Sequence, residues 1–249
     1  LGPGKVRTLE RGHLFTMGEI ARKAQYDEEW FYRKFGIDGE ILIDHAFGIE
    51  PVTMKDIKSY RSSSRSLSNG QVLPRPYRYA EARNVLHEMI DVLCADLFVK
   101  NLHASSFSWW VSYDYKSLEE VPCYDGPVVC DFYGRLHPKH SNSTVRLQLL
   151  TNSPQIVAEA VLASFDRKTD HRLLFRRLGI CANHVTVDDG VFQLDFFTDY
   201  DALEKERKLQ EALFDVRQKY GLNAIFKGNN MLEGANQLER NLQIGGHRA

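Results

Sequence analysis

Between residues 60 and 187 the chain alternates strand-like stretches with two helix-like stretches, and this order restricts the possible folds more than any other feature. Apolar residues at helical spacing predict a long amphipathic helix over 79–101, and a second helix is expected over 154–165. Strands are expected at 62–68, 105–115, 128–136, 144–150 and 173–187, with a turn at Asn69-Gly70. The order approximates βαββαβ. It predicts an α+β, ferredoxin-like domain whose sheet has two helices on one face and an open opposite face.

The flanking segments have a different character. Residues 1–59 read as a small helical module, with helices expected over 5–11, 27–35 and 38–47. Thr16 and Glu19 have the spacing of a capping box, which predicts another helix start. In the third segment, 188–249, a linker precedes a helix expected over 201–220, and the Asn- and Gln-rich tail from residue 229 is expected to be extended or loosely packed.

The composition is that of a soluble protein, with 26% charged and 43% hydrophobic residues. No apolar run approaches the roughly 20 residues of a membrane helix, and the start at Leu1 has neither a basic leader nor a signal-type apolar stretch, so a cytoplasmic protein is expected. We also expect a monomer. The four cysteines form no C-x-x-C pair. This spacing favours reduced, mostly buried thiols over a zinc site or a disulfide framework.

Charge is unevenly distributed along the chain. Residues 58–180 contain 16 lysines and arginines against 12 aspartates and glutamates, although the whole chain has a net charge of −1. Local positive charge is what attracts a polyanion, so this middle part is the candidate for binding nucleic acid.

Two groups of residues in the middle part could bind phosphate. The stretch from Arg61 to Ser68 combines small hydroxyls with arginines on a predicted strand, and Arg61, Ser62, Ser64, Arg65 and Ser66 are its candidates. Arg172, Arg176 and Arg177 could share their surface, because the first and last strands of a split βαβ sheet are often neighbours. A polar edge strand explains the first stretch equally well.

A third candidate lies at the amino terminus, where Gly2 and Gly4 flank Pro3 directly before a predicted helix. Glycines permit close approach, and the amides of Lys5 and Val6 would then point at a phosphate. The alternatives are a turn that merely starts a helix, or residues left from an expression tag.

Taken in order, these motifs resemble a known family. A G-x-G hairpin is followed by T-M-G-E-I-A, then F-G-I-E-P, then S-x-S-x-G-Q-V-L and the βαββαβ unit, and the chain ends E-R-N-L-Q-I-G-G-H-R-A. This order resembles the thumb (1–59) and little finger (60–187) of bacterial Y-family lesion-bypass DNA polymerases, including the mutagenesis-protein branch.

The resemblance implies a role in DNA repair and damage bypass, with primer-template DNA as the partner. In that family Mg²⁺ and deoxynucleoside triphosphates are used by palm carboxylates, which precede the hairpin. No Ser-x-Asp-Glu-like catalytic strand pair occurs in this sequence. We therefore expect no catalytic or metal-binding residue here, no cofactor, and DNA binding without catalysis.

The pentad Gln193-Leu194-Asp195-Phe196-Phe197 resembles the short peptide with which bacterial polymerases bind the sliding clamp. Gln193 could bond the rim of a pocket that Leu194 and the two phenylalanines fill. The position of Phe196 often holds Leu in that motif. The alternative is a terminal strand with Phe192, Leu194 and Phe196 in the core, although a turn-rich linker before the pentad and a helix after it favour the peptide.

Other features are interpreted as structural. His137 and His140 lack further metal ligands nearby, and Asp188-Asp189 is read as a turn. Trp109 and Trp110 must point to opposite faces of their strand, one into the core and one toward the open face.

Two other function classes fit part of the sequence. A freestanding RNA-binding ferredoxin-like module would display aromatic residues on its central strands, whereas the first strand offers Ser and Arg. An adaptor centred on residues 193–197 would leave the basic clusters without a role.

Overall fold

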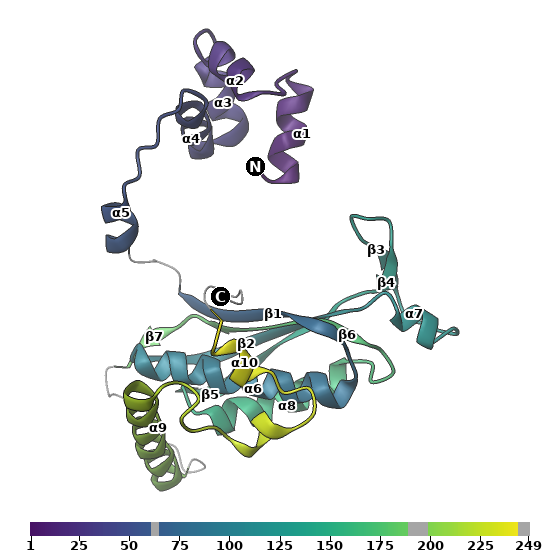
Figure 1. Cartoon of the computed structure of the whole chain (residues 1–249), viewed down its shortest axis with the longest axis vertical. Helices are drawn as coiled ribbons and strands as arrows, with labels where there is room; N and C mark the ends of the chain where they lie inside the picture. The colour runs from purple at the N-terminus through teal and green to yellow at the C-terminus, as the bar shows by residue number, and fades with distance from the viewer. Residues whose placement is uncertain (61–64, 189–198, 244–249) are drawn as a thin grey trace. The chain divides into compact units, whose positions relative to one another are not determined.

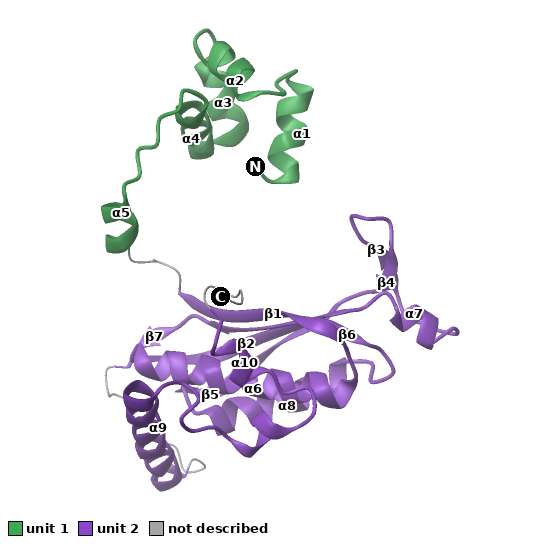
Figure 2. Ribbon diagram, viewed as in Figure 1, with its two compact units in different colours: residues 1–63 green, residues 64–249 purple. Residues whose placement is uncertain are grey.

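The computed structural model describes residues 1–60, 65–188 and 199–243, except for the side chain of Tyr200. The chain forms two compact units, Leu1–Ser63 and Ser64–Ala249, coloured separately in Figure 2. Helices and an antiparallel sheet are both present, so the α+β class is confirmed.

The first unit is helical. Its helices are α1 (Pro3–Arg11), α2 (Met17–Ala24), α3 (Glu28–Phe35), α4 (Ile37–Ala46) and α5 (Met54–Ser59). The Thr16 capping box is confirmed, with the Glu19 amide donating to the Thr16 hydroxyl and the Thr16 amide to the Glu19 carboxylate. A small core around the fully buried Phe31 holds α1 to α4 together.

The helix α5 was not predicted from the sequence. This helix has no buried residue, so it lacks the apolar stripe by which helices are recognised. A local capping box between Thr53 and Asp56 starts it instead.

The second unit contains one large sheet and the helices that cover it (Figure 1). Its strands are β1 (Ser66–Tyr77), β2 (Leu102–Tyr113), β3 (Val128–Cys130), β4 (Leu136–Pro138), β5 (Ser141–Thr151), β6 (Phe175–Asn183) and β7 (Thr186–Val187). Its helices are α6 (Tyr79–Val99), α7 (Ser117–Glu120), α8 (Pro154–Lys168), α9 (Tyr200–Tyr220), the 3-10 turn η1 (Gly228–Met231) and α10 (Gln237–Arg240).

The main sheet has the strand order β1-β6-β2-β5, with every pair antiparallel, and β7 pairs with β2. α6 connects β1 to β2, which are parallel and have β6 between them, and α8 connects β5 to β6, which are parallel and have β2 between them. The predicted βαββαβ order thus forms two interleaved split βαβ units. α6 and α8 cover one face of the sheet (Figure 1), and the core lies between them and the strands. The neighbouring position of the first and last long strands, β1 and β6, is confirmed.

The turn expected at Asn69-Gly70 is wrong, because both residues lie inside β1. Asn-Gly is a strong local signal for a hairpin. Here Asn69 pairs with Ile180 and Gly70 with Gly179, and the Trp110 ring lies 3.7 Å from the position of a Cβ on Gly70. Packing between distant strands outweighs the local preference of the dipeptide.

A single strand over 128–136 is also wrong. The segment is a small hairpin of β3 and β4, whose tip spans residues 131–135. The Asp131 carboxylate accepts the amides of Tyr133 and Arg135 at 2.8 and 2.9 Å, and Gly134 has φ of 80°. These contacts form a turn within a run that was predicted as one strand.

The expectation of a loose tail is wrong for residues 229–243. The Glu88 carboxylate on α6 is 1% exposed and accepts from the Asn230 side chain at 2.6 Å and from the Asn236 amide at 3.0 Å. Arg240 donates to the Asn69 side chain at 3.4 Å. Buried polar groups need hydrogen-bond partners, and the amides of the tail supply them.

The cysteines are free thiols, but the expectation that most are buried is wrong. Cys94 is buried and Cys181 is partly buried, whereas Cys123 and Cys130 are exposed. The exposed pair lies in and beside the β3-β4 hairpin, which contributes little to the core.

Candidate nucleic-acid interface

The sheet face opposite α6 and α8 is made mainly of small polar residues. Directly opposed residues on antiparallel strands point to the same face. Three successive rows cross this face from β1 to β5: Ser66, Asn183, Ser106 and Arg146; then Ser68, Cys181, Ser108 and Thr144; then Gly70, Gly179, Trp110 and Asn142. We call these three rows the open face.

Hydrogen bonds connect several of these side chains. Asn183 donates to the Ser108 hydroxyl at 2.8 Å and to the Ser106 hydroxyl at 3.4 Å, and the Ser108 and Thr144 hydroxyls lie 2.8 Å apart. A hydroxyl can donate one hydrogen bond and accept others. The open face is therefore a shallow surface on which a phosphate backbone could approach closely and find several donors.

Trp110 is the one aromatic side chain in the three rows, and its ring lies across the glycines. It is 40% exposed, whereas Trp109 is 1% exposed and donates to the Ser164 hydroxyl at 3.1 Å, so the expected division of the two tryptophans is confirmed. A Cβ on Gly179 would lie 2.2 Å from the Trp110 ring. Gly179 is thus required for the ring to lie flat against the sheet.

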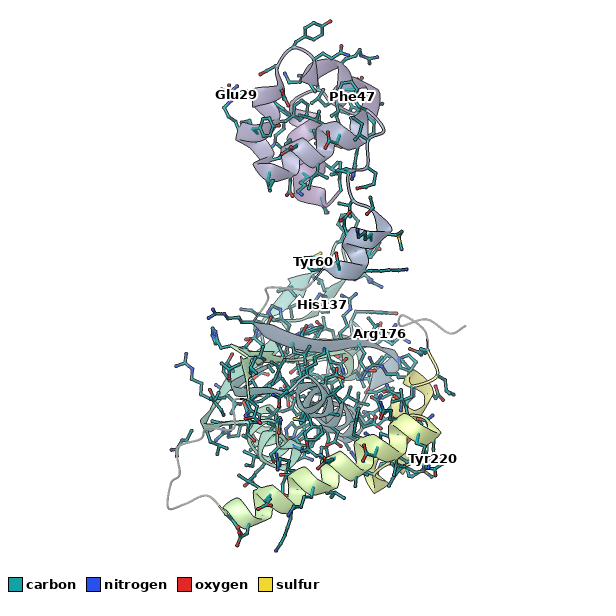
Figure 3. The ribbon with its side chains drawn as sticks, turned by 90° about the vertical axis from the view of Figure 1, so that its left-hand side faces the viewer. Glu29, Phe47, Tyr60, His137, Arg176 and Tyr220 are labelled. Carbon is teal, nitrogen blue, oxygen red and sulfur yellow. The ribbon has the colours of Figure 1, made fainter. Side chains whose placement is uncertain are left out.

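A groove with an excess of positive charge lies at the Tyr113 end of the sheet. It is lined by Val72, Pro74, Arg75, Pro76, Ser112, Tyr113, Asp114, Tyr115, Lys116, Asp131, Arg135, His137, Arg176 and Arg177. We call it the basic groove, because five lysines and arginines line it against two aspartates. Figure 3 labels His137 and Arg176, which contribute to it from β4 and β6.

The cations of the basic groove differ in whether they already form ion pairs or hydrogen bonds within the protein. Arg176 donates to the Leu73 carbonyl and lies 3.8 Å from the Asp114 carboxylate. Arg135 pairs with Asp131 at 2.7 Å. Arg177 is exposed and has no ion pair with any residue in the described ranges, which makes its guanidinium the most available to an anion.

Comparison with known proteins identifies the family of this chain. Residues 64–196 match the model of the impB/mucB/samB family C-terminal domain. The chain belongs to this family. It is 27% identical over 241 residues to DNA polymerase IV 2 of Bacillus subtilis, an alignment that covers 94% of this chain and 52% of that protein.

Two further relatives agree. DNA polymerase IV 2 of Halalkalibacterium halodurans is 24% identical, with 93% of this chain and 50% of that protein aligned. The Bacillus subtilis protein UvrX, whose name assigns it provisionally to UV-damage repair, is 25% identical over 100% of this chain and 53% of its own length. The chain thus spans about half the length of the curated relatives that it matches. The resemblance to the C-terminal part of Y-family polymerases is confirmed.

The first group of predicted phosphate ligands in this impB/mucB/samB domain is described only in part. Arg61, Ser62 and Ser64 lie outside the described residues. Arg65 is exposed just before β1, and its carbonyl accepts the Val185 amide at 2.8 Å. Ser66 begins β1 opposite Asn183 and belongs to the open face.

The residues of the second predicted group, Arg172, Arg176 and Arg177, do not all lie at one site. Arg176 and Arg177 line the basic groove, but Arg172 does not. The Arg172 guanidinium donates to Asp170 at 2.7 Å and to Asp125 at 3.3 Å, and these hydrogen bonds raise the pKa of Arg172 above its ordinary value. Its charge is neutralised locally, so Arg172 is the weakest of the three candidates.

Several groups of the amino-terminal turn already form hydrogen bonds or ion pairs within the first unit. Gly2 is the N-cap of α1, and the Val6 amide donates to the Gly2 carbonyl at 3.1 Å, so this amide does not point at a free anion position. Lys5 pairs with Asp38 at 2.5 Å. The Gly4 carbonyl accepts the Thr8 hydroxyl at 3.1 Å.

The remaining predictions concern the pentad, metal ligands and membrane helices. The pentad of Gln193, Leu194, Asp195, Phe196 and Phe197 lies outside the described residues. Within residues 1–60, 65–188 and 199–243, no group of three or more His, Cys, Asp or Glu side chains could hold a metal ion. None of the described helices is long and apolar enough to cross a membrane.

Sequence reasoning did not identify Lys116 and Arg135 as candidate ligands. Both come from the segment between β2 and β5, and Arg135 reaches the groove only because β3 and β4 fold into a hairpin. An isolated arginine after Gly134 gives no signal in the sequence, so only the fold could reveal it.

Proposed function

We propose that this chain is the DNA-holding part of a lesion-bypass DNA polymerase, and that it binds the backbone of primer-template DNA through the open face and the basic groove. The observation that carries the proposal is the continuity of the two surfaces: Trp110 and Ser112 lie on the same face of β2, and Ser112 pairs with Arg177 of the groove. The family membership and the polymerase names of two relatives support it.

The chemistry of this surface favours contacts with phosphates over contacts with bases. Its donors are hydroxyls and guanidinium groups on a shallow surface, and phosphate contacts fix position without reading sequence. A polymerase that copies damaged templates needs a grip that tolerates altered bases. In the family that the chain resembles, nucleotide addition with Mg²⁺ belongs to the palm, so we propose that this chain alone binds DNA without extending a primer.

The test is a fluorescence-anisotropy titration of the chain with two primer-template DNAs of unrelated sequence, at several salt concentrations. The groove has a surplus of three positive charges from its Lys, Arg and Asp side chains. Neutralising about three phosphates gives a slope of log K against log salt of about −2.7. Equal affinities for the two sequences with a slope near this value support the proposal, and a slope near zero contradicts it.

A single-stranded nucleic-acid module is the second candidate, and Trp110 is the observation that favours it. Its ring lies on a central strand and is 40% exposed, a position from which an aromatic residue can stack on a base. Titration with single-stranded RNA separates the two functions. Tighter binding to RNA than to primer-template DNA, lost in Trp110→Leu, would favour the second candidate.

We also propose that residues 193–197 bind a sliding clamp. The support is the spacing of Gln193, Leu194 and Phe197, together with the position of the pentad between β7 and α9. A pull-down with purified clamp checks it, with Asn152→Ala as the matched polar control. Capture that survives Gln193→Ala and Phe197→Ala would contradict the proposal.

A further inference from the structure

The β3-β4 hairpin presents two adjacent aromatic side chains at its tip. Phe132 is 85% exposed and Tyr133 is 76% exposed, and their rings lie edge to face with centroids 5.4 Å apart. In Figure 1 the hairpin stands out from the sheet on the side opposite α6 and α8, which is the side of the open face. The aromatic pair therefore projects on the face that we propose binds DNA.

Several contacts hold the tip in a defined conformation. The Asp131 carboxylate accepts two tip amides and pairs with the Arg135 guanidinium at 2.7 Å, and the Asp131 amide donates to the Arg135 carbonyl at 2.9 Å. Gly134 supplies the positive φ that the turn requires. Ordering a loop costs conformational entropy on binding, and a preformed tip reduces that cost.

The tip is also joined to the basic groove. Asp131, Arg135 and His137 of the hairpin line the groove, and the Arg135 guanidinium lies 5.2 Å from the Tyr133 ring centroid and 5.4 Å from that of Tyr115. A polyanionic strand in the groove would thus meet the Arg135 cation directly beside the Tyr133 ring. Cationic grooves next to exposed aromatic side chains are the arrangement that binds single-stranded nucleic acid.

We propose that one ring of the edge-to-face pair Phe132 and Tyr133 stacks on an unpaired base of the template strand and the other contacts the edge of that base, while the basic groove holds the adjacent backbone. An unpaired base is the ligand, because a base within a duplex would first have to be unstacked at a cost in free energy. This inference rests on the proposed DNA binding and adds a preference for the single-stranded overhang of the template.

The experiment compares the full chain with the double variant Phe132→Leu/Tyr133→Leu, which keeps apolar side chains but removes the rings. The control is Tyr220→Leu, because Tyr220 is 66% exposed and has the Lys219 ammonium 5.1 Å from its ring centroid. The probes are a blunt duplex and the same duplex with a template overhang that contains 5-iodouracil. Irradiation crosslinks this base to an aromatic ring stacked on it.

For the double variant we expect affinity for the overhang DNA to fall by about tenfold or more, the usual effect of losing a stacked base, with no change in affinity for the blunt duplex. The crosslink to residues 132 and 133, mapped by mass spectrometry, should disappear. Tyr220→Leu should change neither result. The melting temperature should stay constant, because the replaced side chains are exposed.

The outcomes distinguish this inference from the function on which it rests. Wild-type chain that binds both DNAs equally, or a double variant that still favours the overhang, would overturn the stacking role and leave DNA binding by the open face and groove intact. A wild-type crosslink that maps to Trp110 would overturn it as well. No binding to either DNA would overturn the proposed function itself.

Discussion

The charge of Arg177 gives the sharpest test of the basic groove. Arg177 lies in β6 next to Arg176, is exposed, and has no ion pair within the described residues, so Arg177→Gln removes one available positive charge without leaving a buried partner. Each lost phosphate contact reduces the salt slope by about 0.9 for duplex DNA. Between ~50 and ~200 mM salt, a difference of this size changes the affinity ratio of wild type to variant by about 3.5-fold.

The matched control is Arg172→Gln, because Arg172 is also exposed but its guanidinium is held by Asp170 and Asp125. Its removal should leave the salt slope unchanged. Anisotropy titrations of wild type and both variants with one primer-template DNA measure the three slopes. Equal slopes for all three proteins, or a larger change in Arg172→Gln than in Arg177→Gln, would refute the assignment of the groove as the phosphate site.

Three further predictions concern stability and are checked by thermal or urea denaturation. Gly179→Ala places a methyl group 2.2 Å from the Trp110 ring, so we expect the free energy of unfolding to fall by about 1–3 kcal/mol. The double variant Gly179→Ala/Trp110→Ala should recover most of this stability. The control Gly228→Ala meets no atom within 4 Å and should have little effect on packing. Glu88→Ala leaves two donors of the tail without their acceptor, so we expect the free energy of unfolding to fall by about 2 kcal/mol and proteolysis at Arg240 to become faster. The control is Asp96→Ala, because Asp96 is exposed on the same helix. Burial acts to raise the pKa of Asp166, but hydrogen bonds from Arg83 and Tyr79 outweigh it and hold the pKa below its ordinary value of 3.8. Asp166 therefore contributes stability above pH 3.8 that is lost as the pH falls below this value, and Arg83→Ala should make this acid loss smaller; an unchanged acid profile would contradict the role of the pair.

Elements with a strong hydrophobic periodicity could be predicted from the sequence. The helices near 79–101, 154–165 and 201–220 appear as α6, α8 and α9, because each has an apolar stripe or a clear start and stop signal such as Gly221, with φ of 98°. The α5 helix, the β3-β4 hairpin and the folded tail were missed, because they are fixed by local side-chain caps or by buried polar groups rather than by hydrophobic period.

The interface could be predicted only in part for a related reason. A serine-rich strand and a pair of arginines are visible in the sequence, and the pairing of β1 with β6 follows from the split βαβ order. The basic groove also needs Arg75, Lys116 and Arg135, which come from three separate parts of the chain. Nothing in their sequence neighbourhoods indicates that the fold brings them together.

The strand order has a consequence for how the second unit is made. β2 and β5 are close in sequence and can pair early. Among the described strands β1 pairs only with β6, and Arg240 donates to Asn69 across 171 positions. Contacts between such distant segments slow folding, because a long loop must close before they form. During synthesis on the ribosome, β1 emerges first and stays unpaired until residue 183 has been added. The growing chain therefore carries an unsatisfied strand edge while the residues between β1 and the end of β6 are added, which is the interval when a chaperone would protect it.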